Sequence, residues 1–89
     1  MHYTYILYSK KSNNFYYGLT SNVHNRLVQH NLGEVFSTAP YRPWELVFYA
    51  AFASERLASE FEHYLKTGSG KAFAYKRLLK TDMYKKDKQ

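Results

Sequence analysis

A chain of 89 residues suits a single domain, and its lack of cysteine excludes both a disulfide scaffold and a cysteine-ligated zinc site. Aromatic residues make up 19% of the chain, too much bulky apolar surface for a disordered protein, while no apolar run approaches the roughly 18 residues of a membrane span. The net charge is +6, and because basic and acidic residues balance over positions 1–65, the whole excess lies in residues 66–89.

The first part of the chain predicts a hairpin. Tyr, Thr and Ile in residues 3–9 favour a strand, whose alternation places Tyr5 and Leu7 on one face. Residues 15–19 predict a second strand, and the short polar connection makes the pair antiparallel. Gly18 in that strand indicates a bulge or a place where another group approaches the backbone closely.

A helix is predicted over residues 23–32, capped by Ser21 or Asn22 and ended by Gly33. Arg26 and His30 are four residues apart, so both side chains leave the same side of this helix. The expected apolar face consists of Val23, Leu27 and Leu32.

The second part of the chain predicts a strand and two helices. After a loop at residues 34–43, residues 44–52 are almost continuously apolar, as expected of a strand covered on much of both faces. Ser54 caps a helix over residues 55–66, which ends at the glycine-rich stretch 67–70. The expected buried stripe of this helix is Leu57, Phe61, Tyr64 and Leu65.

A last helix is predicted over residues 71–80, anchored by Phe73, Leu78 and Leu79. The order is therefore β-β-α-β-α-α, and the fold class is α+β, with a small three-stranded, mainly antiparallel sheet flanked by helices. Residues 1–80 form the expected single domain, and residues 81–89 form a charged C-terminal tail.

Several polar side chains could together attack a phosphodiester bond. Strand tyrosines can move a proton, Arg26 can clamp a phosphate oxygen, and His30 can assist proton transfer. Glu62, at the edge of an apolar stripe, can hold a hard divalent cation. Each residue taken singly is more often structural: a packing tyrosine, a solvated helix face or a surface glutamate paired with Lys66.

Five short motifs resemble those of the GIY-YIG nuclease superfamily, and they occur in that family's order. They are Y-T-Y at 3–5, Y-Y-G at 16–18, R-L-V-Q-H-N at 26–31, R-P-W-E-L-V at 42–47 and A-S-E-F-E-H-Y-L-K at 58–66. The chain is similar to a small stand-alone member, comparable to the nuclease domain at the N-terminus of the bacterial excision-repair nuclease.

The resemblance implies a role for each matching residue. Tyr5 would be the general base for the attacking water, with Tyr16 orienting water or phosphate. Arg26 would stabilise charge on the phosphate, while His30 would assist proton transfer or hold Tyr5. Glu62 would be the single protein ligand of a divalent metal, Mg²⁺ or Mn²⁺. An asparagine that often follows the metal-binding helix has no counterpart, because residues 63–89 contain none.

The leading interpretation is a metal-dependent endonuclease that hydrolyses DNA, in a context such as DNA repair or recombination. An alternative is a nucleic-acid-binding module with little turnover, and a third is a structural protein whose tyrosines are core residues. In the first two, the backbone of DNA would be gripped by Lys71, Lys76, Arg77 and Lys80. One site cuts one strand, so a double-strand cut would need a homodimer or two events. We expect a cytoplasmic protein without membrane contact.

Overall fold

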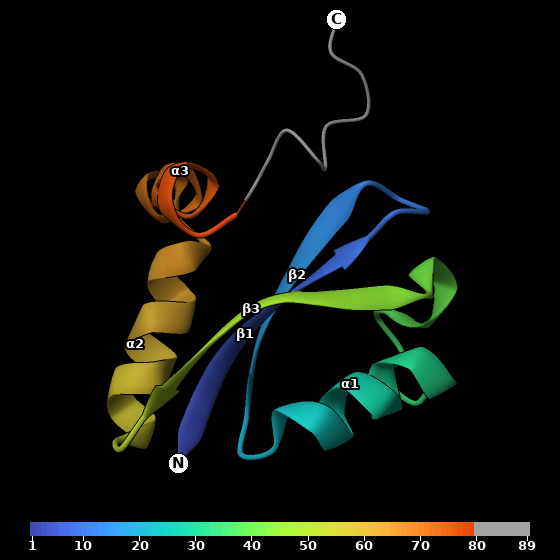
Figure 1. The fold of residues 1–89 in the computed structure, drawn as a ribbon, viewed down its shortest axis with the longest axis horizontal. Helices are drawn as coiled ribbons and strands as arrows, with labels where there is room; N and C mark the ends of the chain where they lie inside the picture. Colours follow the sequence, from blue (N-terminus) through green and yellow to red (C-terminus); the bar gives the residue numbers. More distant parts are fainter. Residues whose placement is uncertain (80–89) are drawn as a thin grey trace, which may run out of the picture.

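The computed structural model describes residues 1–79 and confirms the expected fold class. The chain runs in the predicted order β-β-α-β-α-α, with one additional short 3₁₀ helix, η1 (Figure 1). The elements are β1 (His2–Ser9), β2 (Asn14–Thr20), α1 (Val23–Leu32), η1 (Ala39–Tyr41), β3 (Trp44–Phe52), α2 (Glu55–Leu65) and α3 (Gly68–Arg77). Lys80 and the tail at residues 81–89 lie outside the described residues.

The sheet is antiparallel throughout, in the order β2-β1-β3, so β1 is the central strand. The expectation that residues 44–52 are covered on much of both faces is wrong, because β3 lies at an edge of the sheet and Tyr49 is 55% exposed. The strand that is covered on both faces is β1, whose residues from Thr4 to Ser9 are all buried. Pairing on both sides, rather than apolar content, decides which strand is central.

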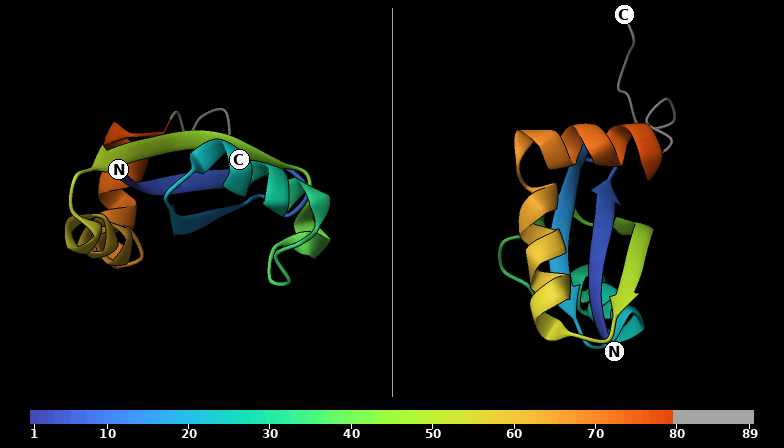
Figure 2. Two further views of the ribbon diagram at one scale, coloured as in Figure 1. Left: turned by 90° about the horizontal axis from the view of Figure 1, so that it is seen from below. Right: turned by 90° about the vertical axis from the view of Figure 1, so that its left-hand side faces the viewer.

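Two cores lie on the two faces of the sheet, and the alternation along β1 separates them. Ile6 faces α2 and α3, where it packs with Leu65 and Ala74. Tyr5 and Leu7 face the other way, where they pack with Trp44, Tyr16, Leu27 and Leu46. The sheet is arched, with β3 on its outer side, and α1 and α2 project on the side that carries β2 (Figure 2). Within residues 1–79, no helix is long and apolar enough to cross a bilayer.

The buried face of α2 differs from the expected stripe. Leu57 and Tyr64 are exposed, whereas Ala58, Glu62 and Leu65 are buried. The helix turns this face to the sheet because the Thr4 hydroxyl donates a hydrogen bond to the Ala58 carbonyl at 2.7 Å. Such a close approach needs a small residue at position 58, and a leucine there would hold the helix away.

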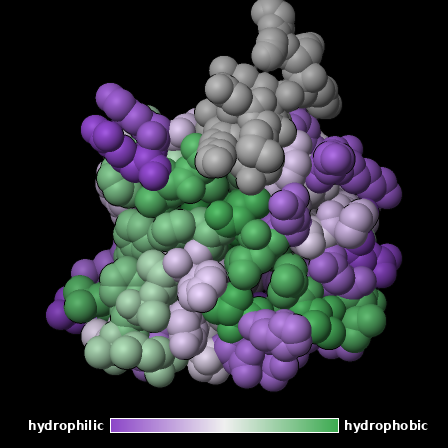
Figure 3. Space-filling view, viewed as in Figure 1, coloured by the Kyte–Doolittle hydropathy of each residue, from purple (hydrophilic) through white to green (hydrophobic). Residues whose placement is uncertain are grey.

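Aromatic side chains of α2 and α3 pack against one another from the edge of the core to the surface. Phe61 lies next to Tyr64, and Tyr64 next to Phe73, with ring centroids 6.4 Å and 6.0 Å apart. Phe73, which was expected to anchor α3, is thus 39% exposed, while Leu79 is buried as expected. Apolar side chains are continuous over α2, α3 and β3 on the face drawn in Figure 3.

Helix α3 begins at Gly68 rather than at the expected Lys71. The Thr67 side chain caps it by accepting a hydrogen bond from the Gly70 backbone N–H at 3.0 Å. A Cβ atom at Gly70 would overlap the Tyr64 carbonyl of α2, so the glycine allows the first turn of α3 to cross the end of α2. The glycine-rich stretch therefore starts a helix as well as ending one.

We predict that Gly70→Ala lowers the free energy of unfolding by about 1–3 kcal/mol, because backbone atoms must shift to accommodate the methyl group. Gly68→Ala is the matched control, since a Cβ there meets no atom within 4 Å and alanine restricts the unfolded chain. Urea unfolding of both variants measures the difference. Equal stability of the two variants would contradict the close helix crossing.

Candidate active site

Helix α1 is fixed at both ends and tied to β3. Asn22 caps it by accepting a hydrogen bond from the Asn25 backbone N–H, and Gly33 ends it at a φ of 82°. Asn22 is one of the two caps that the sequence predicts, and Gly33 is the predicted end. The Asn31 side chain donates to the Trp44 carbonyl at 3.0 Å and accepts from the Trp44 N–H at 2.6 Å. These two hydrogen bonds between Asn31 and Trp44 set the rotation of α1 against the sheet.

In this orientation α1 buries a histidine rather than its last leucine. His30 is completely buried, whereas Leu32, an expected apolar anchor, is 63% exposed. The imidazole lies between the two tyrosines of the hairpin, with its ring centroid 5.9 Å from that of Tyr5 and 5.0 Å from that of Tyr16. The structure thus brings three of the five predicted site residues into contact.

Hydrogen bonds on both ring nitrogens define what His30 can do. Its Nε2 is 2.8 Å from the Tyr5 hydroxyl, and its Nδ1 is 2.7 Å from the Thr38 hydroxyl. Thr38 donates its own proton to the Val35 carbonyl at 3.3 Å, so it accepts from His30 Nδ1–H. The Nε2 lone pair is then left to accept the proton of Tyr5.

The charge state of His30 agrees with this direction. Burial, and after it the nearby positive charge of Arg26, together lower the pKa of the imidazole from 6.5 to about 4. The ring is therefore neutral at physiological pH, with one N–H and one free lone pair. A neutral ring is what allows Tyr5 to donate to Nε2 rather than compete with a second N–H.

The Tyr5 hydroxyl responds to charges from three other predicted site residues. Burial raises its pKa above 10, Arg26 opposes this through a hydrogen bond and its charge, and Tyr16 and Glu62 raise it. Side chains from β1, β2, α1 and α2 thus act on one oxygen atom. A tyrosine that acts alone as a base at neutral pH needs a lowered pKa, and the direction for Tyr5 is the opposite, so Tyr5 can accept a proton only if it passes its own to His30.

Gly18 explains how Tyr5 reaches this position. The two residues are opposite each other in the β1–β2 ladder, and the end of the Tyr5 ring passes close to the glycine. A Cβ atom at position 18 would be 2.5 Å from both the Cζ and the hydroxyl oxygen of Tyr5. The close approach expected at Gly18 is confirmed, and the group that approaches is the candidate catalytic ring itself.

Glu62 is the carboxylate of the candidate site, and at 6% exposure it is buried rather than at the edge of a stripe. Its Oε2 forms an ion pair with Lys66 at 2.5 Å, and its Oε1 is 4.0 Å from His63. Within residues 1–79, no three His, Cys, Asp or Glu residues gather in a way that could hold a metal ion. One carboxylate fits a hard cation such as Mg²⁺, which keeps most of its waters, and does not fit a zinc-type cage.

Residues 1–76 match the family model of the GIY-YIG catalytic domain. The chain belongs to the GIY-YIG family. It is 36% identical over 66 residues to UPF0213 protein YazA of Bacillus subtilis (strain 168), a match that covers 73% of this chain and 66% of that protein. It is also 39% identical over 69 residues to UPF0213 protein SH2523 of Staphylococcus haemolyticus (strain JCSC1435), covering 76% of this chain and 83% of that protein.

Two residues of this GIY-YIG site carried no role in the sequence analysis. Thr38 sets the tautomer of His30, and Asn31 sets the rotation of the helix that carries it. Asn31 directly follows His30 in a quoted motif, which was a usable signal. Thr38 lies in a loop without periodicity, so only the folded structure reveals its partner.

The basic residues of α3 are not part of this cluster. Lys71, Lys76 and Arg77 are exposed and have no ion-pair partner in the described part of the chain. Helix α3 crosses the end of α2, on the opposite side of the sheet from α1 (Figure 1). Their predicted contact with a nucleic-acid backbone would therefore lie beside the site, and that prediction stays open.

We predict that His30 makes the free energy of unfolding fall as the pH drops from 6.5 to about 4. In this range the unfolded chain binds a proton on His30 that the folded chain does not, so acid favours unfolding. Urea unfolding of the parent protein and of His30→Gln near pH 7 and pH 5 measures the effect. The variant should lose this part of the pH dependence, and an unchanged dependence would show that His30 is not held neutral.

Proposed function

We propose that this chain is a metal-dependent endonuclease that hydrolyses phosphodiester bonds of DNA. The observation that carries the proposal is the hydrogen-bond chain from Tyr5 through His30 to Thr38. A neutral, buried histidine that accepts from a tyrosine forms a path along which a proton can leave the attacking water. The family model supports the same class of reaction.

Proton transfer would involve Tyr5 and His30 in one concerted step. Water gives a proton to the Tyr5 oxygen as the Tyr5 proton moves to His30 Nε2, and the resulting hydroxide attacks phosphorus. The bond from phosphorus to the leaving ester oxygen then breaks, and that oxygen takes a proton from solvent. The low pKa of His30, about 4, means that its extra proton is readily released, which restores the neutral pair.

Arg26 and Tyr16 would act on the phosphate. Arg26 is half-buried on α1, and one of its terminal nitrogens donates to the Gln29 side chain at 2.9 Å. Its positive charge also acts on the Tyr5 hydroxyl, whose pKa it lowers against the effect of burial. The guanidinium is therefore held near the reacting oxygen, where it can stabilise the negative charge that develops on phosphorus-bound oxygens. Tyr16, beside the His30 ring, can orient a phosphate oxygen or the attacking water.

Glu62 would hold the divalent cation, Mg²⁺ or Mn²⁺. The cation supplies electrostatic stabilisation of the phosphate and activation of water. Glu62 is pre-positioned by its burial in α2, and its carboxylate already forms an ion pair with the ammonium of Lys66. Lys66 is half-exposed, so its ammonium can turn to solvent or to the phosphate where Glu62 would hold the cation.

A binding module with little turnover is the second candidate. It is favoured by the raised pKa of Tyr5 and by the exposed, unpaired cations of α3 in the described residues. Both candidates predict binding of DNA, and they differ in whether metal-dependent cleavage occurs.

We predict that Glu62→Gln lowers metal-dependent DNA cleavage by at least about 100-fold, because a neutral amide does not replace an anionic ligand of a hard cation. Glu60→Gln is the matched control, since Glu60 is an exposed glutamate of the same helix that pairs with Arg56 at 2.8 Å. Initial rates on linear, flapped and branched DNA with Mg²⁺ or Mn²⁺ measure both. Equal rates in the two variants would remove Glu62 from the metal site.

We predict that the double variant Lys71→Glu, Lys76→Glu weakens DNA binding and flattens its salt dependence, whose slope is about −0.9 per phosphate contact. The charge-reversed control is Arg56→Glu, on an exposed part of α2. Binding isotherms at several salt concentrations give the slopes, and circular dichroism reports the fold. An unchanged affinity and slope would mean that these lysines form only a solvated helix face.

A further inference from the structure

The loop between α1 and η1 carries a phenylalanine that is almost completely exposed. Phe36 is 95% exposed, more than any other large apolar side chain of residues 1–79. The turn beneath it is well fixed, because the Val35 carbonyl accepts hydrogen bonds from the Thr38 N–H at 3.1 Å and the Ala39 N–H at 3.0 Å. An ordered turn thus presents an apolar ring to water. This exposure costs free energy, because the ring forgoes the stabilisation that burial of its apolar surface would give.

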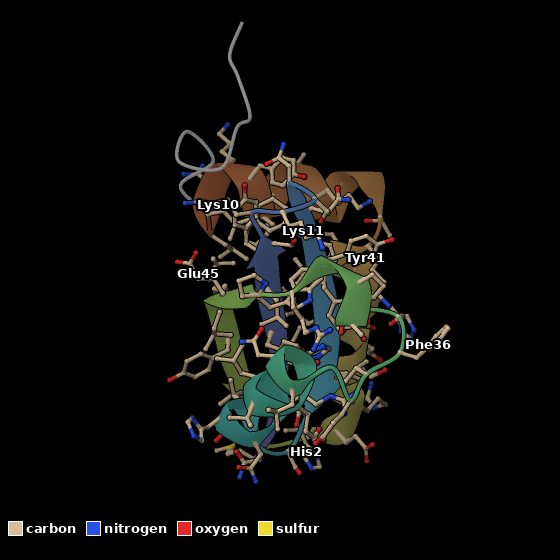
Figure 4. All side chains as sticks on the ribbon, turned by 90° about the vertical axis from the view of Figure 1, so that its right-hand side faces the viewer. His2, Lys10, Lys11, Phe36, Tyr41 and Glu45 are labelled. Atoms are coloured by element: carbon tan, nitrogen blue, oxygen red, sulfur yellow. The ribbon has the colours of Figure 1, made fainter. Side chains whose placement is uncertain are left out.

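The position of this ring connects it to the candidate active site. Thr38, two residues further along the turn, is the partner of His30 Nδ1. In Figure 4, the Phe36 side chain projects outward from its loop, on the same side of the molecule as Tyr41. It points away from Glu45 of β3, which lies on the opposite side. It therefore projects on the β2 side of the arch, the side toward which α1 and α2 extend.

Two cations outside this loop, Lys11 of the β1–β2 turn and Arg42 after η1, offer positive charge to a polyanion. Lys11 and Arg42 line a hollow of about 430 Å³ together with Asn31, Ala39 and the two prolines of the loop, and no acidic side chain of the described residues lines it. The Arg42 Nε donates to the Ala39 carbonyl at 2.7 Å, which holds its guanidinium over Gly33. A phosphate in this hollow would place the rest of its nucleotide strand along the loop.

The occupant that fits both features is a strand with an unpaired base. Exposed aromatic rings bind single-stranded nucleic acid by stacking on base faces, while cationic side chains of the same protein follow the backbone. In an intact duplex both faces of each base are covered by its neighbours, so stacking on Phe36 requires a base that is unpaired or displaced.

We propose that Phe36 stacks on an unpaired nucleobase of the substrate strand, and that the protein thereby selects DNA with unpaired bases next to the cleaved bond, such as flaps, bubbles or branch points. The inference deepens the proposed nuclease function and rests on it for the identity of the ligand. Phe36 is a specificity residue in this account, not a catalytic one.

Binding is measured in the Glu62→Gln background, so that cleavage does not interfere. The probes are a labelled oligothymidine and a mixed-sequence duplex of equal length, at one fixed salt concentration. Phe36→Ala should weaken binding of the single strand by about 5- to 100-fold and change duplex binding by less than about twofold. Tyr49→Ala is the matched control, because Tyr49 is an exposed aromatic residue of β3, the edge strand on the other side of β1 from β2, and it should change neither.

A direct contact has a second readout. Phe36→Trp should keep single-strand affinity, and its exposed indole should lose fluorescence when the oligothymidine binds. Tyr49→Trp should show no loss beyond the background of Trp44, which is buried in both variants.

The inference is overturned if Phe36→Ala weakens single-strand and duplex binding equally, if it weakens neither, or if the protein binds neither probe. It is also overturned if the variant changes only the sedimentation coefficient, because Phe36 would then join two copies of this chain. Failure of the nuclease proposal is separate: a protein that shows Phe36-dependent single-strand binding but cleaves no DNA with Mg²⁺ or Mn²⁺ loses the hydrolysis and keeps this site.

Discussion

The hydrogen bond between the Tyr5 hydroxyl and His30 Nε2 is the interaction around which the rest of the site is arranged. It joins the central strand to α1 inside a small core, where an unpaired polar group would cost free energy. Burial lowers the pKa of His30 and raises that of Tyr5, so it favours the neutral form of both side chains, and each satisfies the other by a hydrogen bond. Packing and candidate chemistry therefore depend on the same pair.

Other features of the fold serve to hold this pair. Gly18 makes room for the Tyr5 ring, Asn31 sets the rotation of α1, and Thr38 leaves His30 Nε2 free to accept. These residues come from β2, α1 and the loop before η1, so three separate parts of the chain position the Tyr5–His30 pair. The arch of the sheet then leaves α1 and α2 projecting on one side, with Arg26 and Glu62 carried by those two helices (Figure 2).

The sequence predicted the elements and their order because local signals specify them. The caps at Asn22 and Ser54, the helix end at Gly33 and the close approach at Gly18 were all read from single residues and are confirmed. The rotation of α2 was not predictable, since it depends on the Thr4 hydroxyl of a distant strand meeting the Ala58 carbonyl. The role of Thr38 and the start of α3 at Gly68 likewise depend on contacts between elements, which periodicity does not encode.

The measurement that tests the central claim most directly is the ¹⁵N NMR spectrum of the His30 ring as a function of pH. The account predicts a neutral ring protonated at Nδ1, with Nε2 unprotonated, from about pH 8 down to about pH 5, and titration near pH 4. A ring protonated at Nε2 in this range, or titration near 6.5, would mean that Tyr5 does not donate to His30. The proposed path for the proton of the attacking water would then not exist.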